Sequence, residues 1–163
     1  MHEDDPVAAF VDQWRRERPD LDPDPMLIVA RIVRLAEIFD AYLRPTFADA
    51  GLGNGEFDVL AALRREGQPY ALSPGELSEA MLVTTGAVSK RIDRLQHRGL
   101  VDRSIAATDA RARLVTLTPA GVELVDALMG RHLDRQRALV ADLTAQERER
   151  LGDLLGVLGR SVD

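Results

Sequence analysis

The chain of 163 residues contains no cysteine, a single tryptophan, a single lysine and no long apolar run. The absence of cysteine excludes disulfides, thiol redox sensing and cysteine-ligated zinc. The three histidines, at positions 2, 97 and 132, are far apart and lack the spacing of metal ligands. No stretch approaches the roughly 20 apolar residues that a membrane span requires. We therefore predict no metal, no cofactor and no membrane partner.

Signals for catalysis and for export are also missing. The sequence has no Ser-His-Asp order, no glycine-rich phosphate loop and no metal cluster, so we predict that the chain is not an enzyme. His97, beside Asp93 and Arg98, is interpreted as part of a helix surface. The acidic N-terminus lacks the basic start and apolar core of a signal peptide. A cytoplasmic location is therefore expected.

The net charge of −6 argues at first against a nucleic-acid partner, but the charge is unevenly distributed. Residues 84–113 contain seven Lys or Arg and three Asp, which gives +4 and leaves −10 for the rest of the chain. The distribution of charge matters more than the sum for nucleic-acid binding. The excess of arginine over lysine is explained by codon usage better than by function.

The stretch from Ser73 to Ala120 is the most informative part of the sequence. It is interpreted as helix, short turn, helix, strand, charged loop and strand, with strands at Leu100-Val101 and 114–117 and the loop over 102–113. A helix-turn-helix followed by a basic β-hairpin can place one helix in the major groove and the hairpin in the neighbouring groove. The pattern therefore predicts a reader of duplex DNA.

Local signals set the limits of these helices. Ser73 and Glu76 form a capping box, with proline at the first helical position, and Thr84 can cap the second helix. Gly99 can end that helix in a left-handed turn. The residues expected to face the core are Leu77, Ala80, Met81, Val88, Ile92 and Leu95.

Helices are predicted on both sides of this unit. Two lie before it, from Pro6 to near Pro19 and from Pro25 towards Leu43, and a third covers about 56–65. Two follow it, from Pro119 to about Ala141 and from a capping box at Thr144. The fold class is mainly α with a small β-hairpin wing: a winged helix-turn-helix with N- and C-terminal dimerisation helices. The expected segments are 1–50 for the added and first dimerisation helices, 51–120 for the DNA-binding lobe and 121–163 for the C-terminal dimerisation helices, all in one compact chain.

From Leu52 to about Leu158 the chain resembles the MarR family of winged-helix transcriptional regulators. The segments that carry the resemblance are 55–60, 72–77, 90–95, 98–101, 109–111 and 115–121. The resemblance implies an obligate homodimer that binds a palindromic operator in double-stranded DNA, usually as a repressor. One departure is Ala110, where such wings usually carry a second basic residue.

Candidate DNA contacts follow from the motif. Thr85, Ser89 and Lys90 lie on the outer, N-terminal side of the second helix, where side chains of a recognition helix meet base edges. Arg94 suits a phosphate, as does the helix start at Ser73. Arg111 at the tip of the hairpin suits a narrow minor groove. The predicted set is Ser73, Thr84, Thr85, Ser89, Lys90, Arg94, Arg111 and Arg113.

A narrower resemblance concerns the urate-responsive branch of the family. In that branch a Trp, an Asp and two Arg line a pocket between an added N-terminal helix and the DNA-binding lobe. The matching residues here are Trp14, Asp58, Arg91 and Arg103. The resemblance implies a small anionic ligand, urate or a related purine, that releases the protein from DNA by preferring the conformation that cannot bind it.

Other interpretations stay open. Asp58 and Arg91 can form a plain structural ion pair, Trp14 can be a core residue, and Arg111 can pair with Asp109 to shape the loop. The proposed recognition face can be a solvated helix surface. At the level of function, the alternative is a winged-helix DNA-binding protein that has no effector, or one that responds to a different aromatic ligand.

Overall fold

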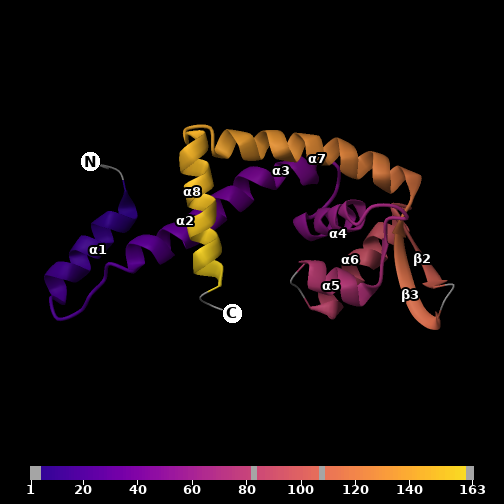
Figure 1. The fold of residues 1–163 in the computed structure, drawn as a ribbon, viewed down its shortest axis with the longest axis horizontal. Coiled ribbons are helices and arrows are strands. Elements are labelled where there is room, and N and C mark those ends of the chain that lie inside the picture. The colour runs from indigo at the N-terminus through magenta and orange to yellow at the C-terminus, as the bar shows by residue number, and fades with distance from the viewer. Residues whose placement is uncertain (1–4, 82–83, 107–108, 161–163) are drawn as a thin grey trace. The chain divides into compact units, whose positions relative to one another are not determined.

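A computed structural model describes residues 5–81, 84–106 and 109–160, with the side chains of residues 85, 106 and 109–112 also outside the description. The chain divides into two compact units, Met1–Tyr42 and Leu43–Asp163 (Figure 1). The predicted functional segments 1–50, 51–120 and 121–163 stay predictions, because this division by contacts does not test what each segment does.

The first unit is made of helices α1 (Pro6–Glu17) and α2 (Met26–Leu43), of which only the last residue passes into the second unit. Asp5 caps α1 by accepting a hydrogen bond from the Val7 amide at 3.0 Å. The same carboxylate pairs with Arg31 on α2, so one acidic residue connects the two helices. The Arg31 guanidinium holds the pKa of Asp5 below its usual value.

The second unit contains the predicted helix-turn-helix and the helices around it. Positions 82–83, between the two helices of this predicted motif, lie outside the described residues. The elements, in chain order, are α3 (Pro45–Ala48), α4 (Asn54–Arg65), β1 (Ala71–Leu72), α5 (Pro74–Met81), α6 (Thr85–His97), β2 (Val101–Ala106), β3 (Asp109–Leu117), α7 (Pro119–Leu139) and α8 (Ala145–Gly159).

The three strands form one antiparallel sheet in the order β1-β3-β2. Figure 1 shows the hairpin of β2 and β3. Arg103 on β2 faces Val115 on β3, and Leu72 on β1 faces the same Val115 from the other side. The prediction of a loop over 102–113 was wrong, because most of that segment pairs as strand. The described residues 102–105 and 113 are exposed, so no alternation of apolar and polar residues marks this part of the hairpin as strand. The two-residue strand β1 was also missed.

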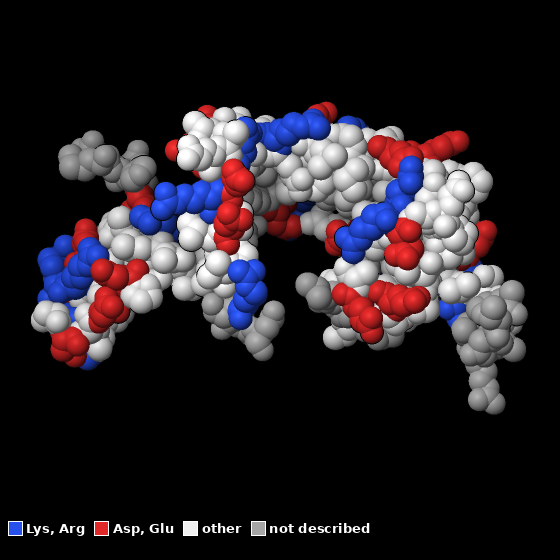
Figure 2. Space-filling view, in the orientation of Figure 1, with Lys and Arg blue, Asp and Glu red and all other residues white. Residues whose placement is uncertain are grey.

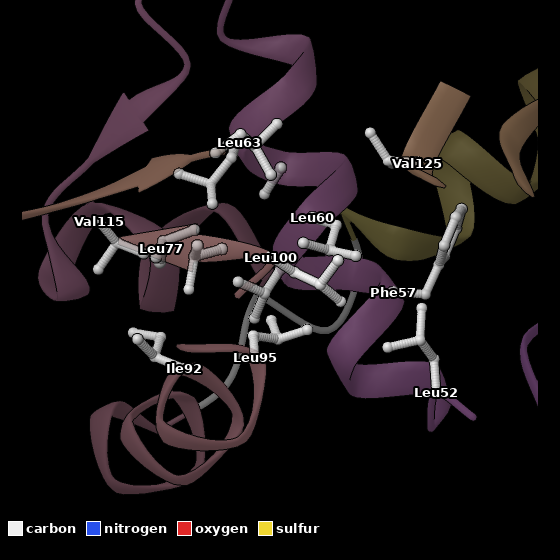
Figure 3. Packing of buried hydrophobic residues seen from close by; sticks show 14 of the residues in the cluster. Leu52, Phe57, Leu60, Leu63, Leu77, Ile92, Leu95, Leu100, Val115 and Val125 are labelled. Atoms are coloured by element: carbon white, nitrogen blue, oxygen red, sulfur yellow. The ribbon is translucent and has the colours of Figure 1, made fainter. Parts of the chain in front are cut away.

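The core of the second unit lies between α4, α5, α6, the sheet and α7. Leu60, Leu63, Leu77, Ile92 and Leu95 are fully buried and pack together (Figure 3). Full burial of a side chain of this size stabilises the fold by about 1.5–3 kcal/mol. The predicted spacing of apolar residues on the second helix is confirmed.

Two details of the predicted helices were wrong. Helix α4 begins at Asn54 and not at Glu56, because Gly53 takes the N-cap position. On α5, Ala80 is exposed, whereas Ser78 is buried and donates a hydrogen bond from its hydroxyl to the Pro74 carbonyl at 2.9 Å. The side chain of Ser78 satisfies its own polar group within the helix, so a buried position tolerates a serine.

The two predicted capping boxes agree with the structure, whereas Thr84 takes the N-cap position of α6 without a capping hydrogen bond from its side chain. Ser73 Oγ accepts from the Glu76 amide at 3.2 Å, and Glu76 Oε2 accepts from the Ser73 amide at 2.7 Å. Thr144 and Glu147 form the same reciprocal pair. Gly99 adopts φ +68°, as the predicted left-handed helix end requires.

Helices α2 and α8 carry large apolar side chains that remain exposed in the single chain. Neither helix buries a residue. Among the described residues, no helix is long and apolar enough to cross a membrane. The exposed apolar side chains are Ile28, Val29, Val33, Leu35 and Ile38 on α2, and Leu151, Leu154, Leu155, Val157 and Leu158 on α8.

Candidate DNA interface and ligand site

The N-terminal turns of α6 present the predicted DNA contacts. Thr84 takes the N-cap position with an extended backbone, and Lys90 is exposed one and a half turns further on. Ser89 is half-buried, and its carbonyl accepts a hydrogen bond from Arg103 at 3.5 Å. The Thr85 side chain lies outside the described residues. The N-terminal half of α6 therefore offers polar and cationic groups while its opposite face is buried.

The wing supplies a second candidate contact. Arg113 lies on β3 opposite Ile105 and is exposed. Arg111 belongs to the same strand two residues earlier. The side chains of Arg111 and Ala110 lie outside the described residues, and so does any pairing of Arg111 with Asp109. The backbone nevertheless places both arginines on the hairpin.

Arg94 is held by a residue to which the sequence analysis assigned no role. Its Nε donates to Glu56 Oε1, although 62% of the Arg94 side chain remains exposed. Glu56 is buried, and its other oxygen accepts from the Gly53 amide at 2.9 Å. The spacing of Gly53 and Glu56, which is that of N-cap and third helical residue, indicates the helix cap but not the bond to Arg94.

Arg103 is also paired within the lobe. Its Nη2 lies 2.5 Å from Asp93 Oδ1, which connects β2 to α6. The pair joins a strand residue to a helix residue ten positions away, so helical spacing alone does not reveal it. Both side chains are partly exposed, and such a pair stabilises by at most about 1 kcal/mol.

Asp58 lies on α4 beside a cavity of about 290 Å³ lined by Asp58, Ala61, Arg65, Ala80 and Met81. Partial desolvation raises the pKa of this exposed carboxyl, while the charges of Arg91, His132 and Arg65 oppose the rise. The volume is at the small end of ligand pockets. Neither Arg91 nor Arg103 lines this cavity.

Arg91 leans inward, as its position on the helical wheel predicts. A Cβ on Gly55 would lie 2.3 Å from the Arg91 Cζ, so the guanidinium occupies space that only a glycine leaves open. Its charge acts on Asp58, but none of the ion pairs among the described residues joins the two. The plain ion pair considered from sequence is therefore not formed in this conformation.

An aromatic cluster next to Asp58 was not predicted. The rings of Phe47 and Phe57 stack at 4.2 Å, and the His132 ring lies 5.1 and 5.5 Å from them. Burial lowers the pKa of His132, and the Asp58 carboxylate opposes that change. The three rings come from α3, α4 and α7, so no local sequence spacing indicates the cluster.

Trp14 belongs to the first unit. It lies on α1 with 47% of its surface exposed, so it is not a core residue of the single chain. The other three residues of the predicted ligand set, Asp58, Arg91 and Arg103, belong to the second unit. An exposed indole offers a flat apolar face and one N–H donor.

The charges on the surface favour one side of the lobe for DNA. On the face shown in Figure 2, acidic residues gather over α5, whose carboxylates are Glu76 and Glu79. Phosphates avoid such a surface. The exposed cations of the predicted set whose side chains are described, Lys90, Arg94 and Arg113, lie instead on α6 and β3.

Comparisons with known proteins match the chain to one family. A model of the MarR family matches residues 50–112. PecS, an HTH-type transcriptional regulator of Dickeya dadantii, is 35% identical over 150 residues, which are 92% of this chain and 90% of PecS.

Two solved structures share the fold. Bordetella bronchiseptica BpsR, whose DNA binding is described as regulated by 6-hydroxynicotinic acid, has a TM-score of 0.71 at 30% identity, covering 80% of this chain and 92% of BpsR. A mutant Escherichia coli MarR complexed with operator DNA has a TM-score of 0.69 at 26% identity, covering 89% and 96%. These relatives are regulators and not enzymes. The chain belongs to the MarR family of winged-helix, DNA-binding transcriptional regulators.

Proposed function

We propose that the chain acts as a homodimeric repressor that binds a palindromic operator and is released by a small planar anion, with urate or a related purine as the first candidate. The observation that carries the DNA-binding part is the start of α6, where Lys90 is exposed above a fully buried Val88 and Ile92. The polar face is free for base edges because the apolar face holds the helix in the lobe.

The homodimer is supported by the exposed apolar faces of α2 and α8. A row of large apolar side chains along a helix is stable in water only when a partner covers it. A second copy of the chain supplies the same two faces, which is the geometry of a symmetric interface. Two copies also present two recognition helices, which is what a palindromic operator requires.

The effector part is supported by Asp58 and Arg91. Asp58 is a carboxyl with a raised pKa at the edge of a cavity, and perturbed carboxyls cluster at functional sites. Arg91 extends from the recognition helix to the start of α4, so a ligand that engages it acts directly on α6. Arg103 supplies a second cation on the same lobe, and Trp14 stays in the proposed set as an aromatic residue of the first unit.

The experiment has two steps on the purified full-length protein. Fluorescence anisotropy first compares a duplex from upstream of its own gene with a scrambled duplex of equal length. Urate, xanthine, salicylate and 6-hydroxynicotinate are then titrated into the complex and, by calorimetry, into the protein alone. We expect urate to bind saturably and to release the specific duplex, and Asp58→Ala and Arg91→Ala to weaken both effects.

Asp142→Ala serves as the matched control, because Asp142 is an exposed carboxylate outside the cavity. The alternative effector is an aromatic carboxylate, which the likeness to BpsR favours. Release by 6-hydroxynicotinate and not by urate would select that alternative. If no compound binds, the DNA-binding role stands and the effector role is wrong.

A further inference from the structure

Three arginines on one face of α6 reach back to the start of α4. They are Arg91, Arg94 and Arg98, spaced so that they lie along the same side of the helix. Arg98 donates from Nη1 to the Gly51 carbonyl and from Nη2 to the Ala50 carbonyl, both at 2.8 Å. Arg91 lies against Gly55, and Arg94 pairs with Glu56. The C-terminal half of α6 and its C-cap are therefore fastened to residues 50–56.

Glu56 differs from the other partners of this face because it is a buried carboxylate. Only 8% of the residue is exposed, and each oxygen has one partner, the Gly53 amide and the Arg94 Nε. A buried charge persists only when it is paired and hydrogen-bonded. One carboxylate oxygen of Glu56 is consequently fixed by the helix cap, and the other holds Arg94.

The Arg94 guanidinium is held in place through its Nε, and its other N–H groups remain available to a ligand. A guanidinium has five N–H donors, and the bond to Glu56 uses one of them. The side chain remains 62% exposed, on the helix that we assign to the major groove. A planar group whose orientation is set in advance loses less freedom when it binds a phosphate.

We propose that Glu56 is a positioning residue for DNA binding, which orients Arg94 towards an operator phosphate without touching DNA itself. This rests on the proposed function, in which Arg94 contacts the DNA backbone. The carboxylate of Glu56 cancels the charge of Arg94, so the net charge of the pair is zero. Charge alone therefore predicts that Glu56 weakens binding to DNA. The geometry predicts instead that Glu56 strengthens binding to DNA, because without its bond to Glu56 the Arg94 side chain is flexible.

The test is a double-mutant cycle in the full-length protein with Glu56→Gln, Arg94→Ala and the double variant. Dissociation constants are measured by anisotropy on the specific and the scrambled duplex at several salt concentrations. We expect Arg94→Ala to weaken specific binding and to reduce the salt slope by about one. We expect Glu56→Gln to weaken specific binding about fivefold or more, and to change it by less than about twofold in the Arg94→Ala background.

Glu79→Gln is the matched control for charge. It removes the same charge from an exposed site on α5, and we expect unchanged or slightly tighter binding. Arg94→Lys is the second variant, since it keeps the charge but lacks the planar fork. It is expected to lose affinity as Arg94→Ala does and to be insensitive to Glu56→Gln. Arg94 is exposed, so these variants test the proposal even if Glu56→Gln lowers the melting temperature.

The failures of the two ideas are distinguishable. If Arg94→Ala leaves specific binding unchanged, the proposed DNA contact is wrong and the positioning role falls with it. If Arg94→Ala weakens binding but Glu56→Gln does so equally in both backgrounds, or not at all, only the positioning role is overturned. In that case Glu56 holds α4 and α6 together and does no more.

Discussion

At the scale of single residues, the presence of glycine at position 55 is explained by the side chain that lies over it. The Arg91 guanidinium fills the position where a Cβ would stand. We expect Gly55→Ala to displace this flexible side chain and to leave the fold intact, because alanine is the better helix former by about 1 kcal/mol. The variant should melt no lower than the parent and should bind urate more weakly.

Calorimetric titration and thermal melting of the same preparation check this prediction. Gly86→Ala is a suitable control, because its Cβ would meet no neighbour within 4 Å. Normal urate binding by Gly55→Ala would show that the position of Arg91 is irrelevant to the ligand.

The pKa of Asp58 gives a second prediction at this scale. Since partial desolvation raises the pKa above the unfolded value of 3.8, the folded state binds the proton more readily than the unfolded state. The ionised carboxylate therefore lowers the stability at neutral pH, and that loss disappears as the pH falls towards the unfolded pKa. We expect Asp58→Asn to be more stable than the parent at pH 7, with a smaller difference at pH 4.

Urea unfolding at the two pH values measures the difference. A variant that is less stable than the parent at pH 7 would contradict the assigned direction. It would mean that the positive charges of Arg91, His132 and Arg65 outweigh the desolvation.

At the scale of elements, the start of α7 is tied to the turn after α6. Thr118 Oγ1 donates to the Gly99 carbonyl at 2.8 Å and accepts from the Gly121 amide at 3.0 Å. A Cβ on Gly121 would lie 2.1 Å from the Leu100 carbonyl oxygen, which is backbone and cannot rotate away. We expect Gly121→Ala to lower the free energy of unfolding by about 1–3 kcal/mol, as overpacking does.

Chemical denaturation of the purified variant tests this expectation. Gly130→Ala, in the middle of the same helix with no neighbour within 4 Å, should instead be neutral or slightly stabilising. Equal effects of the two substitutions would contradict a specific contact at Gly121.

The elements also show how far the sequence predicts the fold. Helix α6 was predicted correctly because Val88, Ile92 and Leu95 repeat at the helical period and are all buried. The wing strands were predicted too short, because the segment 102–113 lacks an alternating apolar pattern and its described residues 102–105 and 113 are exposed. No rule of spacing connects Glu56 to Arg94 or Asp93 to Arg103, since these partners are adjacent only after the chain has folded. Residue types at the site are therefore predictable, whereas their pairing is not.

At the scale of the whole molecule, the exposed leucines of α8 predict an assembly that one substitution can break. Leu154 is 58% exposed on this helix. We expect Leu154→Arg to place an unpaired charge in the proposed interface and to shift the protein from dimer to monomer. Operator binding should fall with it, because a monomer presents one recognition helix to a two-fold site.

Sedimentation velocity measures the mass of the variant. The control is Gln146→Arg, which adds the same charge at an exposed position near the start of α8. A Leu154→Arg protein that stays dimeric and binds its operator normally would show that this part of α8 is outside the interface.

Lys90 is the only lysine of the chain, and it stands exposed on the helix that we assign to DNA. Apart from the terminal amine, an acylating reagent has one target on the whole protein. In the proposed complex the DNA covers the Lys90 amine and slows its acylation. The extent of acylation, measured by mass spectrometry of the intact chain, thus reports whether the helix occupies the major groove. For the same reason, acetylation of a lysine side chain on this regulator can occur at Lys90 alone.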